Sequence, residues 1–270
     1  MKSLAKNIPI FRYSIYNLSM SKCVFIADAH LINIDDAEYV DLLEFLNIVC
    51  DESNNIKALY ILGDLFDFFI AFPQVVFYQH MPLLSMLEKI VRSGIKVFYF
   101  EGNHDFFLKK MNFSGFPVEI VERALSVSLD GTKYYISHGD LTNPKDYQHR
   151  LLSNIVRNPL TYTLAYILPP HIVYHFAHWF SSFSRKNISG KKVFDSEIFK
   201  DIAYLLSQRG YKSAILGHFH VTKKIEVPLK DELFQFWLVG SWKEDRSFLI
   251  FDEEKKILEV KNFNKSLKHL

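Results

Sequence analysis

Cysteine is scarce in this sequence, and its scarcity bounds where the protein can work. Among 270 residues there are only two cysteines, Cys23 and Cys50. Two cysteines cannot form the disulfide framework of a small secreted domain, so a reducing compartment is the simpler expectation. Residues 1–20 contain Lys2, Lys6 and Arg12 and no unbroken apolar run, so we expect no signal peptide.

Long apolar runs and a strong charge of one sign are also missing. No apolar run of about 18 residues free of breakers occurs, which argues against a membrane-spanning helix. The formal net charge is only +2, so charge predicts no partner by itself, and we expect no nucleic-acid partner. What the chain does have is length and apolar content: 270 residues are enough for one large domain or a domain with an insertion, and 49% of them are hydrophobic, so the chain can bury a sizeable core.

One pattern recurs five times along the chain: an apolar segment, typical of a buried strand, ends in Asp, His or Asn. In layered α/β folds, ligands bind beyond the carboxyl ends of strands, so we expect these polar residues to meet in one place. The segments and their residues are 23–27 with Asp28 and His30, 58–62 with Asp64, 96–100 with Asn103, 133–137 with His138, and 213–216 with His218 and His220.

These seven side chains carry the oxygens and nitrogens that suit Mn²⁺, Zn²⁺ or Fe. Two adjacent ions need a bridging carboxylate and several imidazoles, and the set contains both. Asp28 and His30 are two residues apart, so we expect them to share a face of an extended segment. We expect the same of His218 and His220. Flanking glycines at 63, 102, 139 and 217 are expected to permit sharp turns. Any one of these residues could be an ordinary turn or cap residue, but the ordered set of five favours a metal site.

The rest of the chain alternates helices and strands and then becomes strand-rich. Helices are expected at 35–51, 75–93 and 195–209, and two short strands at 118–129. Further strands are expected at 224–227, 234–239, 247–251 and 257–260. This order predicts two packed sheets flanked by helices. Residues 1–19 precede the first strand and are expected to form an N-terminal extension.

A basic, aromatic segment interrupts this rhythm. Residues 150–194 contain six Lys or Arg and no Asp or Glu. Pro169-Pro170 divides the segment into two helical stretches, so we expect a helical hairpin that caps the site. Its apolar face, including Ile172, Val173 and Phe176, can pack on the body or contact lipid, and both interpretations stay open. The helically spaced His171, His175 and His178 are expected to face solvent or lipid headgroups rather than a third metal.

The motifs DAH, GDLFD, GNHD, SHGD and GHFH, in this order, resemble those of the calcineurin-like metallophosphoesterases. The resemblance covers residues 28–220 and implies a four-layer αββα double-sheet sandwich. We therefore expect a core of residues 20–142 and 195–265, with an inserted helical cap at 143–194.

The resemblance also implies roles for the candidate residues. One metal ion would take Asp28, His30, Asp64 and His220, and the other Asp64 as the bridge, Asn103, His138 and His218. Water activated by the two ions, most simply Mn²⁺ with Zn²⁺ or Fe as alternatives, would attack phosphorus in line. His104 would donate to a phosphate oxygen or to the leaving group. Asp105 would orient His104, or would be an ordinary turn residue.

Within the family, the chain also resembles the UDP-2,3-diacylglucosamine hydrolases of lipid A synthesis. These enzymes read FISDLHL where this chain reads FIADAHL (25–31), have a cationic helical cap, and carry a GAW-like turn similar to Gly240-Ser241-Trp242. Many of them read GNRD, with Arg in place of His104, which is a departure. The resemblance implies hydrolysis of a nucleotide-linked glycolipid to UMP and lipid X, at the cytoplasmic face of the cell membrane, with the cap on the membrane surface. Cap residues expected to bind the substrate are Asp146, Arg150, Ser184, Asn187 and Lys191.

Two other interpretations stay open. The same chemistry could act on another phosphomonoester or phosphodiester, in a nucleotide, a phospholipid or a phosphoprotein. A non-catalytic interaction module on the same fold is a different class, but such modules lose ligands, and all seven candidates are present here.

Overall fold

The computed structural model describes residues 21–71, 76–111, 118–142, 153–173, 175, 196–230 and 232–270. The residues of the expected N-terminal extension lie outside these ranges, as does most of the second half of the expected cap. Short 3₁₀ helices interrupt the larger elements, at η2 (Glu52–Asn54), η3 (Tyr78–His80) and η4 (Leu108–Met111).

The first sheet has six strands in the order β13-β12-β1-β2-β4-β6. Strands β1, β2, β4 and β6 are parallel to one another, and β12 and β13 complete one edge in antiparallel pairing. Their bounds are β1 (Lys22–Ile26), β2 (Ile56–Ile61), β4 (Lys96–Phe100), β6 (Glu119–Val121), β12 (Ser247–Asp252) and β13 (Ile257–Asn262).

The second sheet has five strands in the order β10-β11-β9-β8-β7. Strand β9 is parallel to both of its neighbours, β8 and β11, and the two outer strands pair antiparallel. The bounds are β7 (Ala124–Leu129), β8 (Thr132–Ser137), β9 (Ser213–Leu216), β10 (Lys223–Pro228) and β11 (Leu233–Leu238). A separate two-stranded sheet joins β3 (Phe69–Ile70) to β5 (Asp105–Phe106), which the sequence did not predict.

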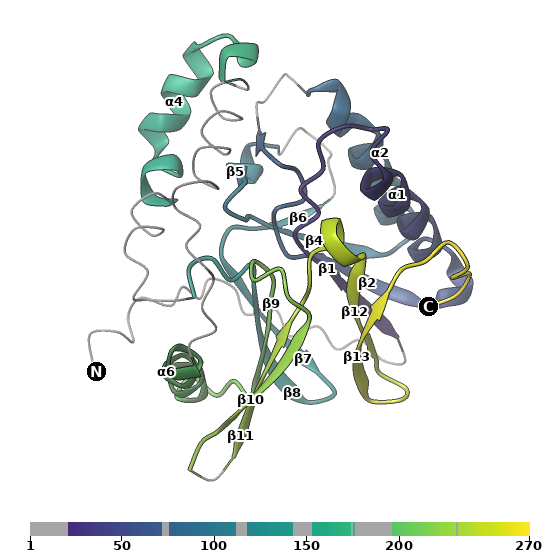
Figure 1. Cartoon of the computed structure of the whole chain (residues 1–270), viewed down its shortest axis with the longest axis vertical. Helices are drawn as coiled ribbons and strands as arrows, with labels where there is room; N and C mark the ends of the chain where they lie inside the picture. The colour runs from purple at the N-terminus through teal and green to yellow at the C-terminus, as the bar shows by residue number, and fades with distance from the viewer. Residues whose placement is uncertain are drawn as a thin grey trace.

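Three buried clusters mark the interfaces of a four-layer sandwich. Helices α1 (Ala37–Val49) and α2 (Met81–Arg92) pack on the outer face of the first sheet, and α6 (Ser196–Ser207) packs on the outer face of the second. The third cluster fills the space between the sheets. Figure 1 shows the two helical layers on opposite sides of the paired sheets. The expected αββα architecture is confirmed.

The apolar run at residues 23–26 of β1 is explained by burial on both faces of the sheet. Val24 and Ile26 belong to the cluster beneath the helices, and Cys23 and Phe25 belong to the cluster between the sheets. A strand buried on both faces reads as a continuous apolar run rather than an alternating one. Phe25 also stacks on Tyr60 of β2 with ring centroids 4.6 Å apart, which fixes the neighbouring strand.

The second helix begins later than the apolar spacing predicts. Its first turn is the 3₁₀ helix η3, and the α-helix starts at Met81 with Pro82 in its first turn. Proline lacks the backbone N–H that an interior helical position needs, so it marks the start of the regular helix. The predicted helix at 75–93 is therefore correct in type and end but wrong at its start.

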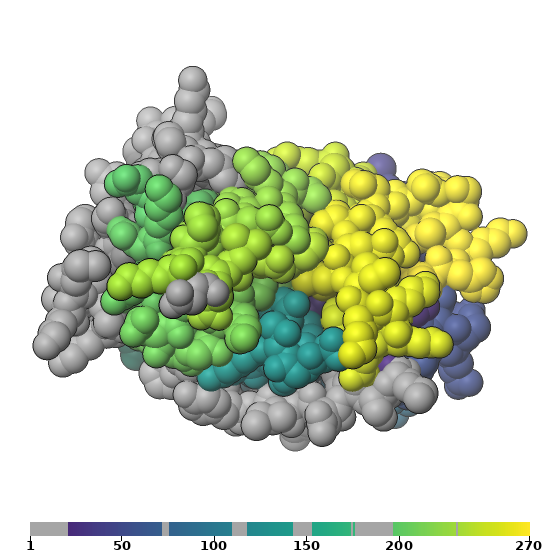
Figure 2. Space-filling model, turned by 90° about the horizontal axis from the view of Figure 1, so that it is seen from below, coloured from purple at the N-terminus to yellow at the C-terminus, as the bar shows by residue number. Residues whose placement is uncertain are grey.

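Strand direction separates the molecule into two ends. Strands β1, β2 and β4 end together at one edge of the first sheet, and β8 and β9 end together in the second. The hairpins β7–β8, β10–β11 and β12–β13 turn at the other end. Figure 2 views that end, where the hairpins lie side by side in teal, green and yellow.

The described part of the expected cap begins with a helical turn at 153–156 and continues in α4 (Pro159–Ile167). The Asn158 side chain accepts a hydrogen bond from the Leu160 backbone N–H (2.8 Å) and caps the N-terminus of α4. The helix ends before Pro169-Pro170, as expected, and residues 170–173 are helical again. No residue of α4 is buried, and Figure 1 shows α4 set apart from both sheets.

None of the helices in the described ranges is both long enough and apolar enough to cross a membrane. The chain beyond the expected core also packs on the body. Leu267 and Leu270 lie against the cluster under α1 and α2, and the Leu270 backbone N–H donates to Asn54 Oδ1 (2.7 Å). The last five residues are thus part of the folded body.

Candidate metal centre

The five predicted strand ends meet at one end of the sandwich. Asp28 and His30 follow β1, Asp64 follows β2, and Asn103 follows β4, all from the first sheet. The remaining three histidines follow β8 and β9 of the second sheet, so both sheets contribute to the centre. They are His138, His218 and His220.

The local backbone at these positions differs from the expected extended segments. Asp28 (φ 53°), His30 (φ 43°), Asp64 (φ 52°), His218 (φ 67°) and His220 (φ 54°) are all in the left-handed region. Residues other than glycine seldom adopt this conformation, and those that do concentrate at functional sites. The two pairs therefore converge through tight left-handed turns and not through strand alternation.

A ladder of backbone hydrogen bonds holds the turns after β1 and β2 side by side. The backbone N–H of Asp28 donates to Gly63 O (3.2 Å), and that of His30 donates to Asp64 O (2.9 Å). The pairing continues from Leu31 to Leu65 (3.1 Å). The strained turns are thus fixed by the same strand neighbours that build the sheet.

The flanking glycines serve two different purposes. Gly63 (φ 91°) and Gly139 (φ 115°) have left-handed backbones, as expected for sharp turns. Gly102 and Gly217 do not. A Cβ on Gly102 would overlap Asp64 Oδ1, and a Cβ on Gly217 would lie 3.0 Å from Ala27 Cβ. These two positions need glycine because another chain segment approaches closely.

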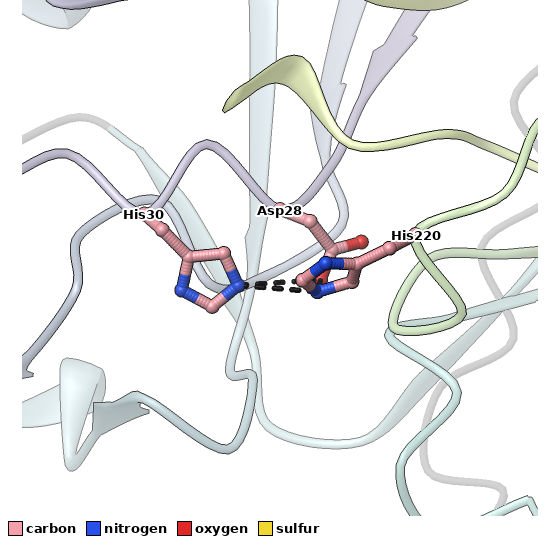
Figure 3. A group of neighbouring side chains, drawn as sticks. All are labelled: Asp28, His30 and His220. Atoms are coloured by element: carbon pink, nitrogen blue, oxygen red, sulfur yellow. Dashed lines mark hydrogen bonds and ion pairs between the residues drawn. The ribbon is translucent and has the colours of Figure 1, made fainter. Parts of the chain in front are cut away.

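The first group of side chains contains Asp28, His30 and His220, whose ligand atoms lie within 4.8 Å of one another. Figure 3 shows the two imidazoles facing each other, with the Asp28 carboxylate beside them. The Nε2 atoms of His30 and His220 are 3.3 Å apart, and His220 Nε2 is 3.2 Å from Asp28 Oδ1. That oxygen is buried and accepts no hydrogen bond.

The second group contains Asp64, His138 and His218. Asn103 joins it, because Asn103 Oδ1 lies 3.1 Å from His138 Nε2 and 2.9 Å from His218 Nδ1. Asp64 stands between the groups: its Oδ2 is 3.7 Å from His30 Nε2 and 3.5 Å from His138 Nε2. This carboxylate is therefore placed to contact ions in both groups.

The protonation pattern at this centre suits cations. His138 Nδ1 donates to Leu62 O (2.7 Å), so its Nε2 presents a lone pair toward the Asn103 amide oxygen. Two lone pairs 3.1 Å apart repel unless a positive ion lies beside them, and the same holds for Asp28 Oδ1 beside His220 Nε2 (3.2 Å). Carboxylate, amide and imidazole donors of this kind fit a divalent transition metal.

Burial and neighbouring charges shift the pKa values of the same groups. Burial lowers the pKa of His30 to about 4, so the ring is neutral at pH 7 and free to coordinate. Burial alone would raise the pKa of Asp64, but the neighbouring His138, His104 and His30 outweigh it and lower this pKa. For Asp28, burial is likewise outweighed by His220 and His138. Both carboxylates are ionised, as metal ligands must be.

His104 lies at the edge of this centre. Its ring meets that of His30 edge-on at 4.8 Å, and its backbone N–H donates to Asp64 Oδ1 (2.8 Å). The expected role of Asp105 in orienting His104 is not what the structure shows. His104 Nδ1 donates instead to the Asp67 carbonyl (2.6 Å), and Asp105 accepts from the Leu65 backbone N–H (3.0 Å). Burial, and then the charge of Asp64, raise the pKa of Asp105.

Helix α7 (Trp242–Asp245) supports the centre from the C-terminal part of the chain. Ser241 Oγ donates to Asp28 O (2.8 Å), and Glu244 Oε1 accepts from His220 Nδ1 (3.3 Å). A carboxylate on the far nitrogen of a metal-binding imidazole fixes which nitrogen faces the ion. The resemblance indicates the Gly240-Ser241-Trp242 turn, but no local pattern in the sequence indicates a role for Glu244.

The sequence pattern likewise predicts no specific role for Arg157. It is one of the basic residues of the expected cap, yet its guanidinium reaches the loop after β4. The predicted substrate contacts cannot be placed, because Asp146, Arg150, Ser184, Asn187 and Lys191 all lie outside the described residues.

Comparison with known families places this centre in a class. Residues 21–222, more than half of the chain, match the family model described as calcineurin-like phosphoesterase. The chain belongs to this family. It is therefore a metal-dependent phosphoesterase, and the clusters of Asp and His described above could hold its divalent metal ions.

The chain is also similar to individual enzymes of this family. A UDP-2,3-diacylglucosamine hydrolase from Psychromonas ingrahamii is 27% identical over 248 residues, covering 90% of this chain and 98% of the relative. An enzyme of the same name from Yersinia enterocolitica is 28% identical over 237 residues, covering 86% of this chain and 95% of the relative. A solved archaeal phosphodiesterase is 14% identical, covers 90% of this chain and 99% of its own, and superposes with a TM-score of 0.44, which is too low to add to the argument.

Proposed function

We propose that this enzyme hydrolyses the pyrophosphate of UDP-2,3-diacylglucosamine to UMP and 2,3-diacylglucosamine 1-phosphate, with two divalent metal ions. The observation that carries the proposal is the convergence of Asp28, His30, Asp64, Asn103, His138, His218 and His220 at five strand ends. The names of the relatives, which align over most of both chains, support the choice of substrate.

The proposed centre has two subsites that share one carboxylate. Asp28, His30, Asp64 and His220 would hold one ion, and Asp64, Asn103, His138 and His218 the other. Two ions in these places would lower the pKa of a water molecule and neutralise charge on the phosphoryl oxygens. Mn²⁺ is the proposed native metal, since oxygen and imidazole ligands suit it and no described thiolate joins the cluster.

His104 is the residue that we propose for proton transfer to the substrate. With Nδ1 donating to the Asp67 carbonyl, His104 keeps its ring in a fixed plane beside His30, and Nε2 is the nitrogen left for the substrate. In the imidazolium form, with a proton on both nitrogens, Nε2 would donate a hydrogen bond to a phosphoryl oxygen, or its proton to the leaving phosphate. His104 is half-buried, which leaves the ring open to a substrate.

The expected cap is the proposed lipid-binding part. Leu160 (66% exposed), Leu164 (56%) and Ile167 (73%) form an exposed apolar surface on α4. Apolar side chains that are exposed together on one helix mark a surface that contacts lipid or protein. We propose that acyl chains and the membrane surface contact this helix at the cytoplasmic face, and that Asp146, Arg150, Ser184, Asn187 and Lys191 bind the sugar and phosphates.

The division into domains follows from the same proposal. Residues 20–142 and 195–265 would carry the hydrolytic centre, residues 143–194 the selectivity for lipid, and residues 1–19 an extension outside both.

The test compares two substrates on the Mn²⁺-loaded enzyme. UDP-2,3-diacylglucosamine and a UDP-sugar without acyl chains are supplied at equal metal and salt, and release of UMP is measured, with EDTA as the blank. Each buried methylene contributes about 0.8 kcal/mol, or about fourfold in binding, so kcat/KM should fall steeply as the acyl chains shorten. Similar kcat/KM for both substrates would contradict the lipid part of the proposal. If the enzyme cleaves simple phosphodiesters but neither UDP-sugar, the proposed chemistry stands and the proposed substrate is wrong.

A matched pair of variants tests the role of α4. Ile167→Ser should raise KM for the acylated substrate and weaken binding to anionic vesicles. Leu233→Ser is the control, because Leu233 is also exposed (47%) and apolar but lies on the hairpin at the other end of the sandwich. Equal effects of the two substitutions would show that α4 has no special role.

A further inference from the structure

Arg157 joins the expected cap to the loop that carries Asn103. Its side chain is 16% exposed and lies 55 residues from its main partner in the sequence. Nη2 donates to the Gly102 carbonyl (2.7 Å) and lies 3.3 Å from Asp140 Oδ2, and Nη1 donates to Ser153 Oγ (2.7 Å). The guanidinium thus bridges its own helical turn, the loop after β4 and the loop after β8.

Arg157 contacts one of the two peptide bonds that flank Asn103. The Gly102 carbonyl belongs to the peptide bond that precedes Asn103, and Arg157 holds it. The peptide bond that follows Asn103 carries the His104 N–H, which donates to Asp64 Oδ1 (2.8 Å). The backbone of Asn103 is therefore fixed on one side by the shared carboxylate and on the other by Arg157.

The direction of the Asn103 side chain depends on that backbone. Its Oδ1 lies within 3.1 Å of His138 Nε2 and 2.9 Å of His218 Nδ1, so a small rotation of the preceding peptide would move it out of the group. Gly102 has no side chain whose packing could hold this peptide bond, and its backbone is not in the left-handed region. Without Arg157, no other described contact holds the Gly102 carbonyl.

Arginine suits this position better than lysine would. Its planar fork reaches two acceptors with one terminal nitrogen and a third with the other, and it stays charged when buried. The carboxylate of Asp140, 7% exposed, lies beside that charge. A lysine ammonium is a single point of charge and would keep at most part of these contacts.

We propose that Arg157 is a positioning residue that sets Asn103 for the subsite formed with His138 and His218. This inference rests on the proposed metal centre. Arg157 acts through the Gly102–Asn103 peptide, so it strengthens one ion's binding and leaves the other group, Asp28, His30 and His220, in place. It also couples the expected cap to the centre, because Arg157 directly follows the helical turn at 153–156 and its backbone N–H donates to Ser153 O (2.9 Å).

The experiment measures metal binding rather than turnover alone. Mn²⁺ is titrated calorimetrically into the metal-free full chain and its Arg157→Gln, Arg157→Lys, Asn103→Ala and Asn103→Ala/Arg157→Gln variants. Arg92→Gln is the matched control, since Arg92 is exposed and, among the described residues, its side chain pairs with Glu88 on its own helix. Melting temperatures of the metal-free proteins report any general loss of stability.

Arg157→Gln should weaken the binding of one ion by about 10–100-fold and leave the other unchanged. The Lys variant should fall between Gln and the wild type, and the double variant should bind no more weakly than Asn103→Ala alone, because both changes affect one residue. With a small phosphodiester at saturating Mn²⁺, KM should stay unchanged and kcat should fall.

Other outcomes would overturn the inference. Unchanged metal affinity in both Arg157 variants, or effects that multiply in the double variant, would show that Arg157 does not act through Asn103. A raised KM with normal metal binding would make Arg157 a substrate-binding residue instead. A wild-type protein that binds fewer than two ions would refute the dinuclear proposal itself, and this inference with it.

Discussion

Replacing Gly102 by Ala should disable the metal centre while leaving the fold in place. Gly102 has no left-handed backbone, so alanine costs no backbone strain there. The added Cβ would overlap Asp64 Oδ1 and lie 2.6 Å from the Asp64 backbone nitrogen. The substitution is therefore a collision between one methyl group and the carboxylate that the two proposed subsites share.

The size of the effect follows from that collision. Ordinary contact requires about 3.5 Å, so the loop or the carboxylate must move by at least about 1 Å. Overpacking of this kind costs about 1–3 kcal/mol, and loss of the hydrogen bond from His104 N–H to the carboxylate costs about 1.5–3 kcal/mol. A 1 Å misplacement at a reacting centre lowers the rate by about 10²-fold. We expect kcat/KM to fall at least that much.

The assay follows three quantities: cleavage of a simple phosphodiester, bound Mn²⁺ per chain, and melting temperature. Gly94→Ala is the control. Gly94 (φ 91°) has nothing within 4 Å of its Cβ position and precedes β4, at the other end of the strand from the centre. Its left-handed backbone makes alanine cost roughly 1–2 kcal/mol in stability. The control variant should thus lose stability but keep its metal and its rate.

The reasoning would be refuted by a Gly102→Ala enzyme with wild-type metal content and rate. Equal losses of metal in the two alanine variants would also contradict it, since the loss would then follow stability and not contact with Asp64.

Two further predictions follow from single side chains. His104→Ala should lower kcat by about 10²–10⁴-fold with bound metal unchanged, and His104→Arg should lower it less; an unchanged kcat in the Ala variant would limit His104 to a structural role. Burial raises the pKa of the Cys23 thiol to about 12, so at pH 8 it stays protonated and unreactive. A thiol reagent should therefore modify only Cys50 in the native protein and both cysteines after denaturation, and native reactivity in a Cys50→Ser variant would contradict the assignment.

Much of the architecture could be predicted because it depends on local pattern. The apolar runs that became β1, β2, β4 and β9 are largely buried on both faces, and such strands are easy to recognise. Parallel strands place their carboxyl ends at one edge, so the meeting of Asp28, Asp64 and Asn103 followed from strand order.

The remaining features depend on contacts between distant segments. No pattern near Asp28 or His30 indicates a left-handed backbone, which is held by pairing with the turn after β2. Asp105 stands beside His104 in sequence, yet its carboxylate turns toward Leu65. Arg157 and Glu244 reach the centre across 55 and 24 residues, and no local signal distinguishes them from other surface charges.

Anomalous diffraction from crystals of the Mn²⁺-loaded enzyme tests the central claim most directly. We predict two peaks about 3.5–4 Å apart at the carboxyl ends of β1, β2, β4, β8 and β9, with the Asp64 carboxylate contacting both ions. A single peak, or two peaks of which one does not contact Asp64, would contradict the proposed dinuclear centre.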